Sequence, residues 1–296
     1  MGHGHHHRHQ PHAGAFRWSV LLNSGLTGLQ LAIGLGCGSL ALISDALHNL
    51  GDVAGLLLGW GAERLAAQPA TARFTYGFGR STQFAALLNA LLILGAALVV
   101  IIEGVERLRH PVPMLALPVA LAALAGVVVN LWSVRLFGGG HQHDLNRRAA
   151  VLHLLSDAAV SVAVLVSALL VQFSGVPWLD PLTAIAVGLG VAWSGWVLLR
   201  QAVVVSLDGI PPGIDREAVE LLLSQLEGVI EVQQLHIWAL SSSRVALSAH
   251  LRCRSGATAT GALLRQAEQQ LKALGIQHST LQVEPADSAG QGGQAG

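Results

Sequence analysis

Six long apolar segments constrain this chain more than any other feature of its sequence. Gly-rich and Pro-rich breaks separate them, and they occupy residues 16–37, 39–62, 82–106, 114–136, 148–173 and 181–204. A helix of about twenty apolar residues crosses the hydrocarbon core of a bilayer, which is about 30 Å thick. Charged residues form only 11% of the chain, whereas soluble domains average about 25%. The sequence therefore predicts a multi-pass membrane protein with six transmembrane helices in a lipid bilayer.

The charged residues exclude one class of partner and predict an orientation. Lys and Arg together number 17, as do Asp and Glu, so no concentrated cationic surface points to nucleic acid. Arginines gather in the N-terminal tail and in the loops after the second and fourth segments, as Arg64, Arg80 and Arg135 illustrate. Basic residues in short loops favour the cytoplasmic side of a membrane. Both termini are therefore expected in the cytoplasm.

A small soluble domain is expected after the sixth segment, where a turn-rich linker at 207–213 precedes a rise in charge density. Asp215 is placed to cap a helix that ends near Leu226. Strands are expected at 229–239, 244–253 and 278–284, with a second helix at 258–274. The face of the first helix that is expected to turn inward comprises Ala218, Leu221, Leu222 and Gln225. The predicted fold is an α-helical membrane protein followed by a small cytoplasmic α+β domain of order α-β-β-α-β.

Composition divides the chain into four parts. Residues 1–15 are expected to form a disordered, His-rich cytoplasmic tail, 16–206 the transmembrane domain, 207–285 the cytoplasmic domain and 286–296 a second disordered tail. Six histidines in the first twelve residues are interleaved with Gly, Arg, Gln and Pro. That interleaving favours a native metal-collecting segment over an added tag, whose histidines usually run without interruption.

Two His and two Asp residues lie inside apolar segments, with the same spacing in each pair. His48 and Asp52 belong to the second segment, and His153 and Asp157 belong to the fifth. An ionisable side chain at the centre of a membrane costs about 2.5–3.5 kcal/mol on the lenient insertion scale, so each one is a functional candidate. Residues four apart lie on one face of a helix. Two such faces in contact would supply the nitrogen and oxygen ligands of a tetrahedral metal site.

The donor set favours Zn²⁺, which accepts mixed nitrogen and oxygen ligands in a tetrahedron. Mg²⁺ and Ca²⁺ prefer shells rich in oxygen. Imidazole and carboxylate also suit Co²⁺, Ni²⁺ and Fe²⁺, and these ions stay as further candidates, with Cd²⁺ beside them. The competing interpretation is a hydrogen bond between His and Asp within each helix. Repetition of the spacing in two apolar segments favours the metal site.

The absence of two sequence motifs argues against two classes of function, a zinc hydrolase and a nucleotide-driven pump. A zinc hydrolase needs a base such as that of His-Glu-x-x-His, and a nucleotide-driven pump needs a phosphate-binding loop; the sequence contains neither motif. The chain is therefore expected not to be an enzyme, to need no organic cofactor and to work as a secondary transporter driven by an ion gradient. A membrane metal sensor or storage protein, which binds divalent metal without transport, is the alternative that stays open.

Four motifs resemble the cation diffusion facilitator family, and most of all its bacterial zinc exporters. They are the segments Ser39–His48, Phe74–Arg80, Glu103–Leu108 and Leu235–Leu240. The resemblance implies a homodimer in the cytoplasmic (inner) membrane, with cytoplasmic domains of metallochaperone-like fold, that exchanges cytoplasmic Zn²⁺ for external protons. It also implies that His48, Asp52, His153 and Asp157 form the transport site. A His at position 48 implies a preference for zinc.

The resemblance also points to a weaker site in the cytoplasmic domain. His250 and Glu284 fall at positions that bind metal in relatives, whereas Gln233 and Gln282 stand where some relatives have His. A regulatory Zn²⁺ site at His250 and Glu284 is one expectation, completed by His278 or by histidines of the tail. His236 is expected to have a structural role instead.

Three further polar features are singled out by their position in or beside apolar segments. Asp45 either passes protons or steers cations, or it caps the start of the second helix. Gln30 and Asn130 are expected to form hydrogen bonds between helices. Arg80 and Asp208, both at cytoplasmic helix ends, are candidates for an ion pair at the membrane surface.

Overall fold

The structure is a computed structural model with two compact units, and each unit is described by itself. One unit comprises residues 1–57 and 89–196, and the other comprises residues 58–88 and 197–296. Residues 12–137, 145–254 and 260–285 are described, and their side chains are described in 24–135, 151–254 and 261–285. The sequence predictions for the terminal tails concern residues that lie largely outside these ranges.

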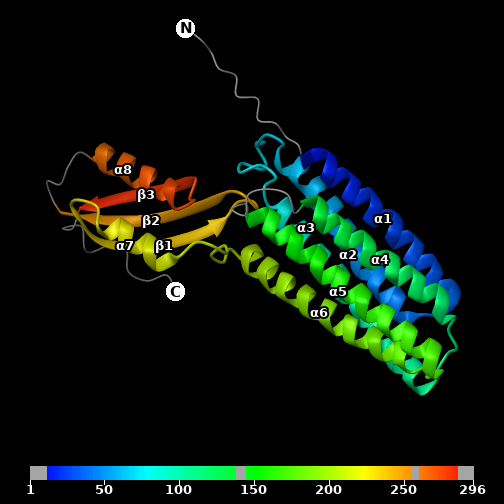
Figure 1. Cartoon of the computed structure of the whole chain (residues 1–296). Helices are drawn as coiled ribbons and strands as arrows, with labels where there is room; N and C mark the ends of the chain where they lie inside the picture. The colour runs from blue at the N-terminus through cyan, green and yellow to red at the C-terminus, as the bar shows by residue number, and fades with distance from the viewer. Residues whose placement is uncertain (1–11, 138–144, 255–259, 286–296) are drawn as a thin grey trace, which may run out of the picture. The chain divides into compact units, whose positions relative to one another are not determined.

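Six long helices lie alongside one another as a bundle (Figure 1). They are α1 (His12–Cys37), α2 (Leu40–Ala66), α3 (Ser81–Arg109), α4 (Ala116–Phe137), α5 (Leu145–Ser174) and α6 (Leu179–Ser206). Within the described residues, the five helices α2 to α6 are long and apolar enough to cross a membrane, and the stretch Ser24–Cys37 of α1 is a shorter apolar helix. α1 begins at His12 rather than at the predicted residue 16.

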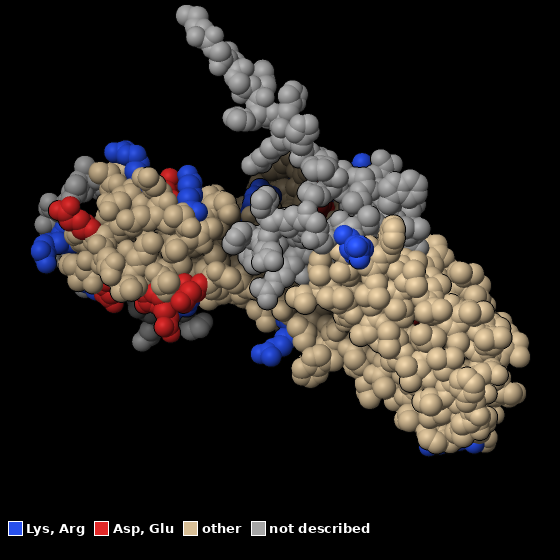
Figure 2. Space-filling model, viewed as in Figure 1, with Lys and Arg blue, Asp and Glu red and all other residues tan. Residues whose placement is uncertain are grey.

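The outside of the bundle is apolar, as lipid contact requires. Large hydrophobic side chains such as Leu98, Leu121 and Trp193 are more than half exposed, at 57%, 60% and 70%. Figure 2 shows the helical part with few charged side chains on the face in view, whereas charged residues gather over the small α+β domain. Monomeric soluble proteins rarely expose such extended apolar surface. The expectation of a multi-pass helical membrane protein is confirmed.

The first turn of α2 is capped by a carboxylate from far along the chain. Asp180, in the first turn of α6, is 4% exposed and accepts a hydrogen bond of 2.7 Å from the backbone N–H of Leu40. The Ser39 hydroxyl donates to the same carboxylate and accepts from the backbone N–H of Leu42 at 3.1 Å. The free N–H groups at a helix start are thereby satisfied without water. This contact joins the ends of α2 and α6.

The α+β domain has the predicted order of elements. It consists of α7 (Arg216–Ser224), β1 (Val229–Ala239), β2 (Val245–Cys253), α8 (Thr260–Ala273) and β3 (His278–Pro285). The sheet order is β1-β2-β3, with β1 and β2 antiparallel and β2 and β3 parallel. Asp215 caps α7 as predicted, because its side chain accepts from the N–H groups of Glu217 and Ala218. The fold class predicted from the sequence is confirmed.

The inward face predicted for α7 is wrong except at Leu222, which packs against the core. Val219 and Leu223 of α7 are buried against Leu247 and Leu251 of β2, whereas Leu221 is 58% exposed. Both choices repeat at helical spacing, so periodicity alone does not separate them. Which face of α7 is buried depends on its packing against the sheet.

The loop between α2 and α3 contacts the turn between β1 and β2, and all of these residues belong to the second unit. The Gln83 side chain donates from Nε2 to the Ala239 carbonyl at 3.0 Å, and Ser242 N–H donates to the Thr82 hydroxyl at 3.0 Å. Arg80 Nη2 lies 2.6 Å from Asp208 Oδ1, which confirms the predicted ion pair. Several hydrogen bonds therefore tie the start of α3 to this turn.

Candidate metal centre

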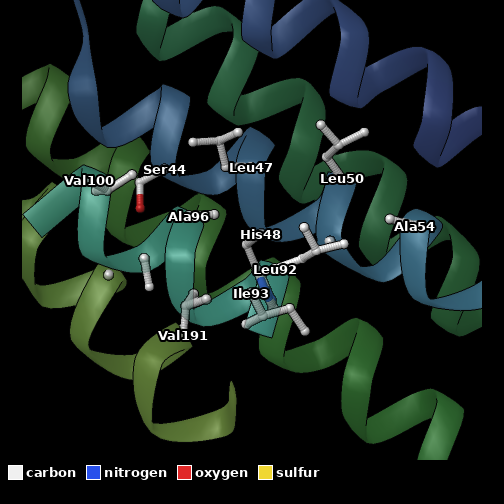
Figure 3. A pocket seen from close by; sticks show the side chains of 13 residues that line it. Ser44, Leu47, His48, Leu50, Ala54, Leu92, Ile93, Ala96, Val100 and Val191 are labelled. Carbon is white, nitrogen blue, oxygen red and sulfur yellow. The ribbon is translucent and has the colours of Figure 1, made fainter. Parts of the chain in front are cut away.

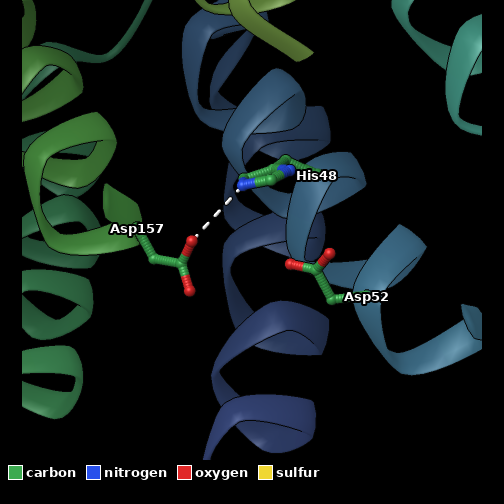
Figure 4. Close-up of side chains that lie close together, drawn as sticks. All are labelled: His48, Asp52 and Asp157. Carbon is green, nitrogen blue, oxygen red and sulfur yellow. Dashed lines mark ion pairs between the residues drawn. The ribbon is translucent and has the colours of Figure 1, made fainter. Parts of the chain in front are cut away.

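The two His-Asp pairs meet inside the helical bundle. α2 carries His48 and Asp52, one turn apart, and α5 carries His153 and Asp157 with the same spacing. Figure 4 shows His48 and Asp52 on one helix and Asp157 pointing toward them from another. The structure therefore brings together all four residues that the sequence singled out.

Each imidazole contacts a carboxylate of the opposite helix. His48 Nε2 lies 3.3 Å from Asp157 Oδ1, and His153 Nε2 lies 3.4 Å from Asp52 Oδ2. His153 Nε2 also lies 3.6 Å from Asp157 Oδ2 of its own helix. Ligand atoms of His48, Asp52 and Asp157 all lie within 4.8 Å of one another. The interpretation as two separate hydrogen bonds, each inside one helix, does not describe this cluster.

Burial is graded across the four side chains. Asp157 is 1% exposed and His48 19%, whereas Asp52 is 31% and His153 49% exposed. Asp157 Oδ1 and Asp52 Oδ2 are buried and face the imidazoles at 3.3 and 3.4 Å, but neither accepts a hydrogen bond from the described residues. A buried carboxylate oxygen without a donor is unfavourable unless a cation or proton compensates it. Two histidines and two carboxylates with free lone pairs suit a divalent cation of the zinc type.

His48 also forms part of the wall of an apolar cavity between α2, α3 and α6 (Figure 3). The cavity measures about 210 Å³, and its other lining residues include Ser44, Leu47, Leu92, Ile93 and Val191. A wider groove of about 800 Å³ between α5 and α6 reaches His48 as well, and polar side chains such as Ser156 and Ser194 line it. Two hollows therefore meet at this one ligand.

Asp45 does not cap α2, so that interpretation is wrong. α2 begins at Leu40, and its cap comes from Ser39 and Asp180. Asp45 lies further along the helix, is completely buried, and accepts hydrogen bonds of 3.0 Å from Gln30 and Ser161. The predicted hydrogen bond of Gln30 between helices is thus confirmed.

His250 and His278 of the cytoplasmic domain lie apart from each other in the sheet. His250 Nδ1 lies 3.3 Å from Glu284 Oε1, and His250 is flanked in the sheet by Gln233 of β1 and Gln282 of β3. His278 pairs with Ala246, four residues along β3 from Gln282, which is about 13 Å at the usual strand rise. The structure therefore joins His250 with Glu284 but does not bring His278 to them.

The remaining histidines of this domain make other contacts. The His278 ring meets the Tyr76 ring edge to face, with centroids 5.9 Å apart. His236 is exposed on β1, opposite Ser248, and lies beside a register shift of that strand. Neither histidine belongs to a group of three or more metal-binding side chains within the described residues.

Among the described side chains, Asp180 is the one buried carboxylate that sequence reasoning missed. It begins the sixth apolar segment and is held by Ser39, Leu40 and Ala41 of another helix. A charged residue next to a long apolar segment was the only signal that could have drawn attention to it. Its role as a distant cap depends on a contact between residues 140 apart in the chain, which no local pattern shows.

The fold and the cluster together define a class of protein. It is a multi-pass helical membrane protein with two histidines and two aspartates gathered between two of its helices, followed by a small α+β domain. Residues 17–205 match the family described as the cation efflux transmembrane domain, and residues 211–286 match the cation efflux protein cytoplasmic domain.

Individual relatives agree with these matches over nearly the whole chain. The metal cation efflux system protein CzcD of Cupriavidus metallidurans is 34% identical over 97% of this chain and 91% of the relative. The cadmium, cobalt and zinc/H(+)-K(+) antiporter of Bacillus subtilis is 32% identical over 95% of this chain and 92% of the relative. Zinc transporter ZitB of Escherichia coli is 32% identical over 96% and 93%. The chain therefore belongs to the cation efflux, or cation diffusion facilitator, family, and these relatives are named as metal transporters or efflux proteins.

Proposed function

We propose that this protein exports Zn²⁺ from the cytoplasm in exchange for protons, as a homodimer in the cytoplasmic membrane with both termini inside. The observation that carries the proposal is the cluster of His48, Asp52, His153 and Asp157. Its imidazole nitrogens and carboxylate oxygens lie 3.3 and 3.4 Å apart across α2 and α5 and 3.6 Å apart within α5, and the two oxygens of the cross-helix contacts are buried without a hydrogen bond from the described residues.

Proton coupling follows from the chemistry of these ligands. Zn²⁺ requires imidazole nitrogens with a free lone pair and ionised carboxylates, so zinc and protons compete for the same four side chains. Zinc entering from the cytoplasm displaces protons, and protons entering from outside displace zinc. Rearrangement of α2 against α5 between the two states completes the exchange, and the proton gradient sets its direction.

The relatives support parts of this proposal. The Bacillus subtilis relative is named as an antiporter with H⁺ and K⁺, and CzcD is named as an efflux protein. The match of residues 211–286 is to a cytoplasmic domain family named for its dimer, which supports the homodimer. Because K⁺ appears beside H⁺ in one name, the test has to separate the two counter-ions.

The decisive assay is zinc flux in proteoliposomes of the purified full chain, with a pH gradient, a K⁺ gradient or neither. We expect the pH gradient alone to drive Zn²⁺ movement. Asp157→Asn keeps the size of the side chain and removes a charged ligand, and should lower the flux at least about tenfold. Asp215→Asn is the matched control, because Asn caps α7 as well as Asp does.

The same assay distinguishes a transporter from a metal sensor or storage protein. A metal sensor or storage protein would bind Zn²⁺ through the same four residues, yet the proteoliposomes would show no flux with any gradient. Flux that ignores the pH gradient would overturn proton antiport, and normal flux in Asp157→Asn would remove the cluster from the transport path.

A further inference from the structure

Asp45 is a second buried carboxylate, and the metal cluster does not include it. Its Oδ2 accepts hydrogen bonds of 3.0 Å from Gln30 of α1 and from Ser161 of α5, and its Oδ1 accepts one of 3.5 Å from Asn49. All three partners are neutral, and no ion pair of Asp45 occurs within the described residues. An ionised carboxylate buried without a cation is unfavourable. This group is therefore poised to take up a proton.

A face of polar side chains runs from Asp45 between α1 and α4. The end of α1 adjoins the start of α4, where Leu115 N–H donates to the Cys37 carbonyl at 3.0 Å, so the two helices run in opposite directions. Gly126 of α4 lies against the side chains of Gln30 and Ser161. Asn130 and Ser133 follow Gly126 on the same helix face, and both are completely buried.

Several polar atoms on this face lack a protein partner among the side chains that the structure describes. They are Gln30 Oε1, Asn130 Oδ1, Asn130 Nδ2 and Ser133 Oγ. Buried polar atoms are almost always hydrogen-bonded, and ordered water fills that role where protein does not. A buried polar atom without any partner is more unfavourable still in a membrane, since lipid offers no hydrogen bonds. The polar face of α1 and α4 is therefore a place for water molecules.

We propose that Asp45 is a second proton-binding group of the transporter, supplied by water along the polar face of α4 and α1 and separate from the metal cluster. The proposal rests on the proton antiport proposed above and adds a residue to it. Water on this face leads from the end of α4 that carries Ser133 toward Asp45. The proton binds the carboxylate while the site is open to the outside. After the helices rearrange, it leaves along this water toward the cytoplasm, so one proton crosses the membrane in each exchange.

Electrostatic linkage connects this group to the metal cluster. Asp45 precedes His48 by one turn of α2, and Ser161 follows Asp157 by one turn of α5, so the two sites are neighbours. A divalent cation at the cluster favours ionised Asp45 and proton release. After the cation leaves, its positive charge no longer favours the ionised form, so Asp45 takes up a proton more readily. Such linkage is reciprocal, so the proton state of Asp45 also biases metal affinity.

Few other ionisable groups face Asp45. His48 lies on its own helix, and His153 and Asp157 are the ionisable residues of the nearby part of α5. The described side chains of α1 include no ionisable group except Cys37, and those of α4 none except Arg135. Among the described side chains of this buried region, Asp45 and the residues of the metal cluster are therefore the groups that bind protons.

The first test counts protons. Proteoliposomes with a zinc dye and a pH dye report the protons moved per Zn²⁺ for the full chain and for Asp45→Asn, which keeps the shape of the side chain. We expect the ratio to fall by about one proton per zinc, whereas an unchanged ratio would overturn the proposal. Asn130→Leu keeps the carboxylate and removes polar atoms next to the water, so it should slow the exchange without changing the ratio.

The second test observes the protonated carboxyl group directly. Infrared difference spectra of the zinc-free protein should show the carbonyl stretch of a carboxylic acid as the pH falls, and zinc should abolish it. Asp45→Asn should lack this band. Ser161→Ala removes a donor that favours the ionised form, so the band should persist to higher pH. Ser167→Ala is the matched control, because this serine of α5 donates to Leu179 instead, and it should not shift the band.

The outcomes distinguish this inference from the proposed function. If the full chain couples zinc flux to protons but Asp45→Asn keeps the full proton ratio and the band, the inference fails and the antiport stands. If zinc flux in the full chain ignores the proton gradient, the antiport fails, and the infrared band still reports whether Asp45 binds a proton. If Asp45→Asn does not fold, an unshifted band in Ser161→Ala overturns the inference.

Discussion

At the scale of single residues, His48 occupies the central position of the cluster. Its Nε2 faces Asp157 at 3.3 Å, and its ring lies 6.4 Å from the ring of His153, centroid to centroid. It also borders the apolar cavity and the wider groove described above. The identity of this one donor therefore affects both the affinity for a metal and the approach to the cluster.

Replacing this imidazole tests metal selectivity. His48→Asp changes the donor set from two nitrogens and two carboxylates to one nitrogen and three carboxylates, which weakens the preference for metals that favour nitrogen. We expect the ratio of Zn²⁺ to Cd²⁺ flux to fall severalfold in competition assays with proteoliposomes. His110→Asp, at a histidine that is 77% exposed, is the control and should leave the ratio unchanged. A ratio as high as that of the original chain would mean that His48 does not set selectivity.

Cys253 allows a prediction about pH. Its side chain is buried in the core of the cytoplasmic domain, and burial raises the pKa of the Cys253 thiol. The thiolate is the reactive form, so alkylation of Cys253 in a Cys37→Ser variant should be much slower in the folded protein than in denaturant at the same pH. The stabilising contribution of the neutral thiol is present below the pKa of the unfolded chain and is lost as the pH rises through the folded value. Equal labelling rates in both states would contradict this account.

At the scale of structural elements, α2 owes its start to another helix. Asp180→Ala removes the acceptor of the Leu40 N–H and of the Ser39 hydroxyl. A lost cap costs about 0.5–2 kcal/mol, and we expect a lower midpoint of thermal unfolding in detergent, followed by tryptophan fluorescence. Asp180→Asn keeps an acceptor and should lose less. An unchanged midpoint in Asp180→Ala would show that this cap adds nothing to stability.

The loop before α3 depends on a glycine for its contact with the cytoplasmic domain. A Cβ at Gly79 would overlap the carbonyl oxygen of Leu240, a backbone atom that cannot swing away. Gly79→Ala should therefore cost about 1–3 kcal/mol, the usual effect of overpacking, and weaken the hydrogen bonds of Thr82 and Gln83 nearby. Hydrogen exchange at Ser242, whose N–H is bonded to Thr82, should become faster.

A second glycine provides the control for this substitution. A Cβ at Gly61 of α2 meets nothing within 4 Å, and alanine favours a helix over glycine by about 0.8–1 kcal/mol. Gly61→Ala should therefore leave exchange at Ser242 unchanged and not reduce stability. The same result for both variants would show that the contact at Leu240 is unimportant.

At the scale of the whole molecule, the pair of His250 and Glu284 makes zinc binding in the cytoplasmic domain testable. Their contact of 3.3 Å offers two ligands, too few for a closed zinc site. In a homodimer, His250→Ala should weaken the zinc-dependent approach of the two cytoplasmic domains, measured as the distance between spin labels at Gln269→Cys. Zinc binding at the transmembrane cluster should persist. His236→Ala, at an exposed histidine of the same sheet, is the control, and an unchanged zinc response in His250→Ala would remove that residue from regulation.

Much of the fold was predictable because it depends on local properties of the chain. Lengths of apolar sequence gave the six helices to within a few residues. Alternation of period two predicted β2. The inward face of α7 was not predictable, because Leu221 and Leu223 both fit a helical repeat, and only contact with β2 selects one of them.

The candidate site shows the same division. The sequence by itself determined which four side chains stand out, since a repeated spacing of His and Asp in apolar surroundings is visible along the chain. Only the tertiary structure decided that His48 faces Asp157, that Asp180 caps α2 and that Asp45 is held by Gln30 and Ser161. These contacts join residues from 15 to 141 positions apart. Spacing within a helix is a property of the backbone, whereas the partner of a helix face depends on the packing of the whole bundle.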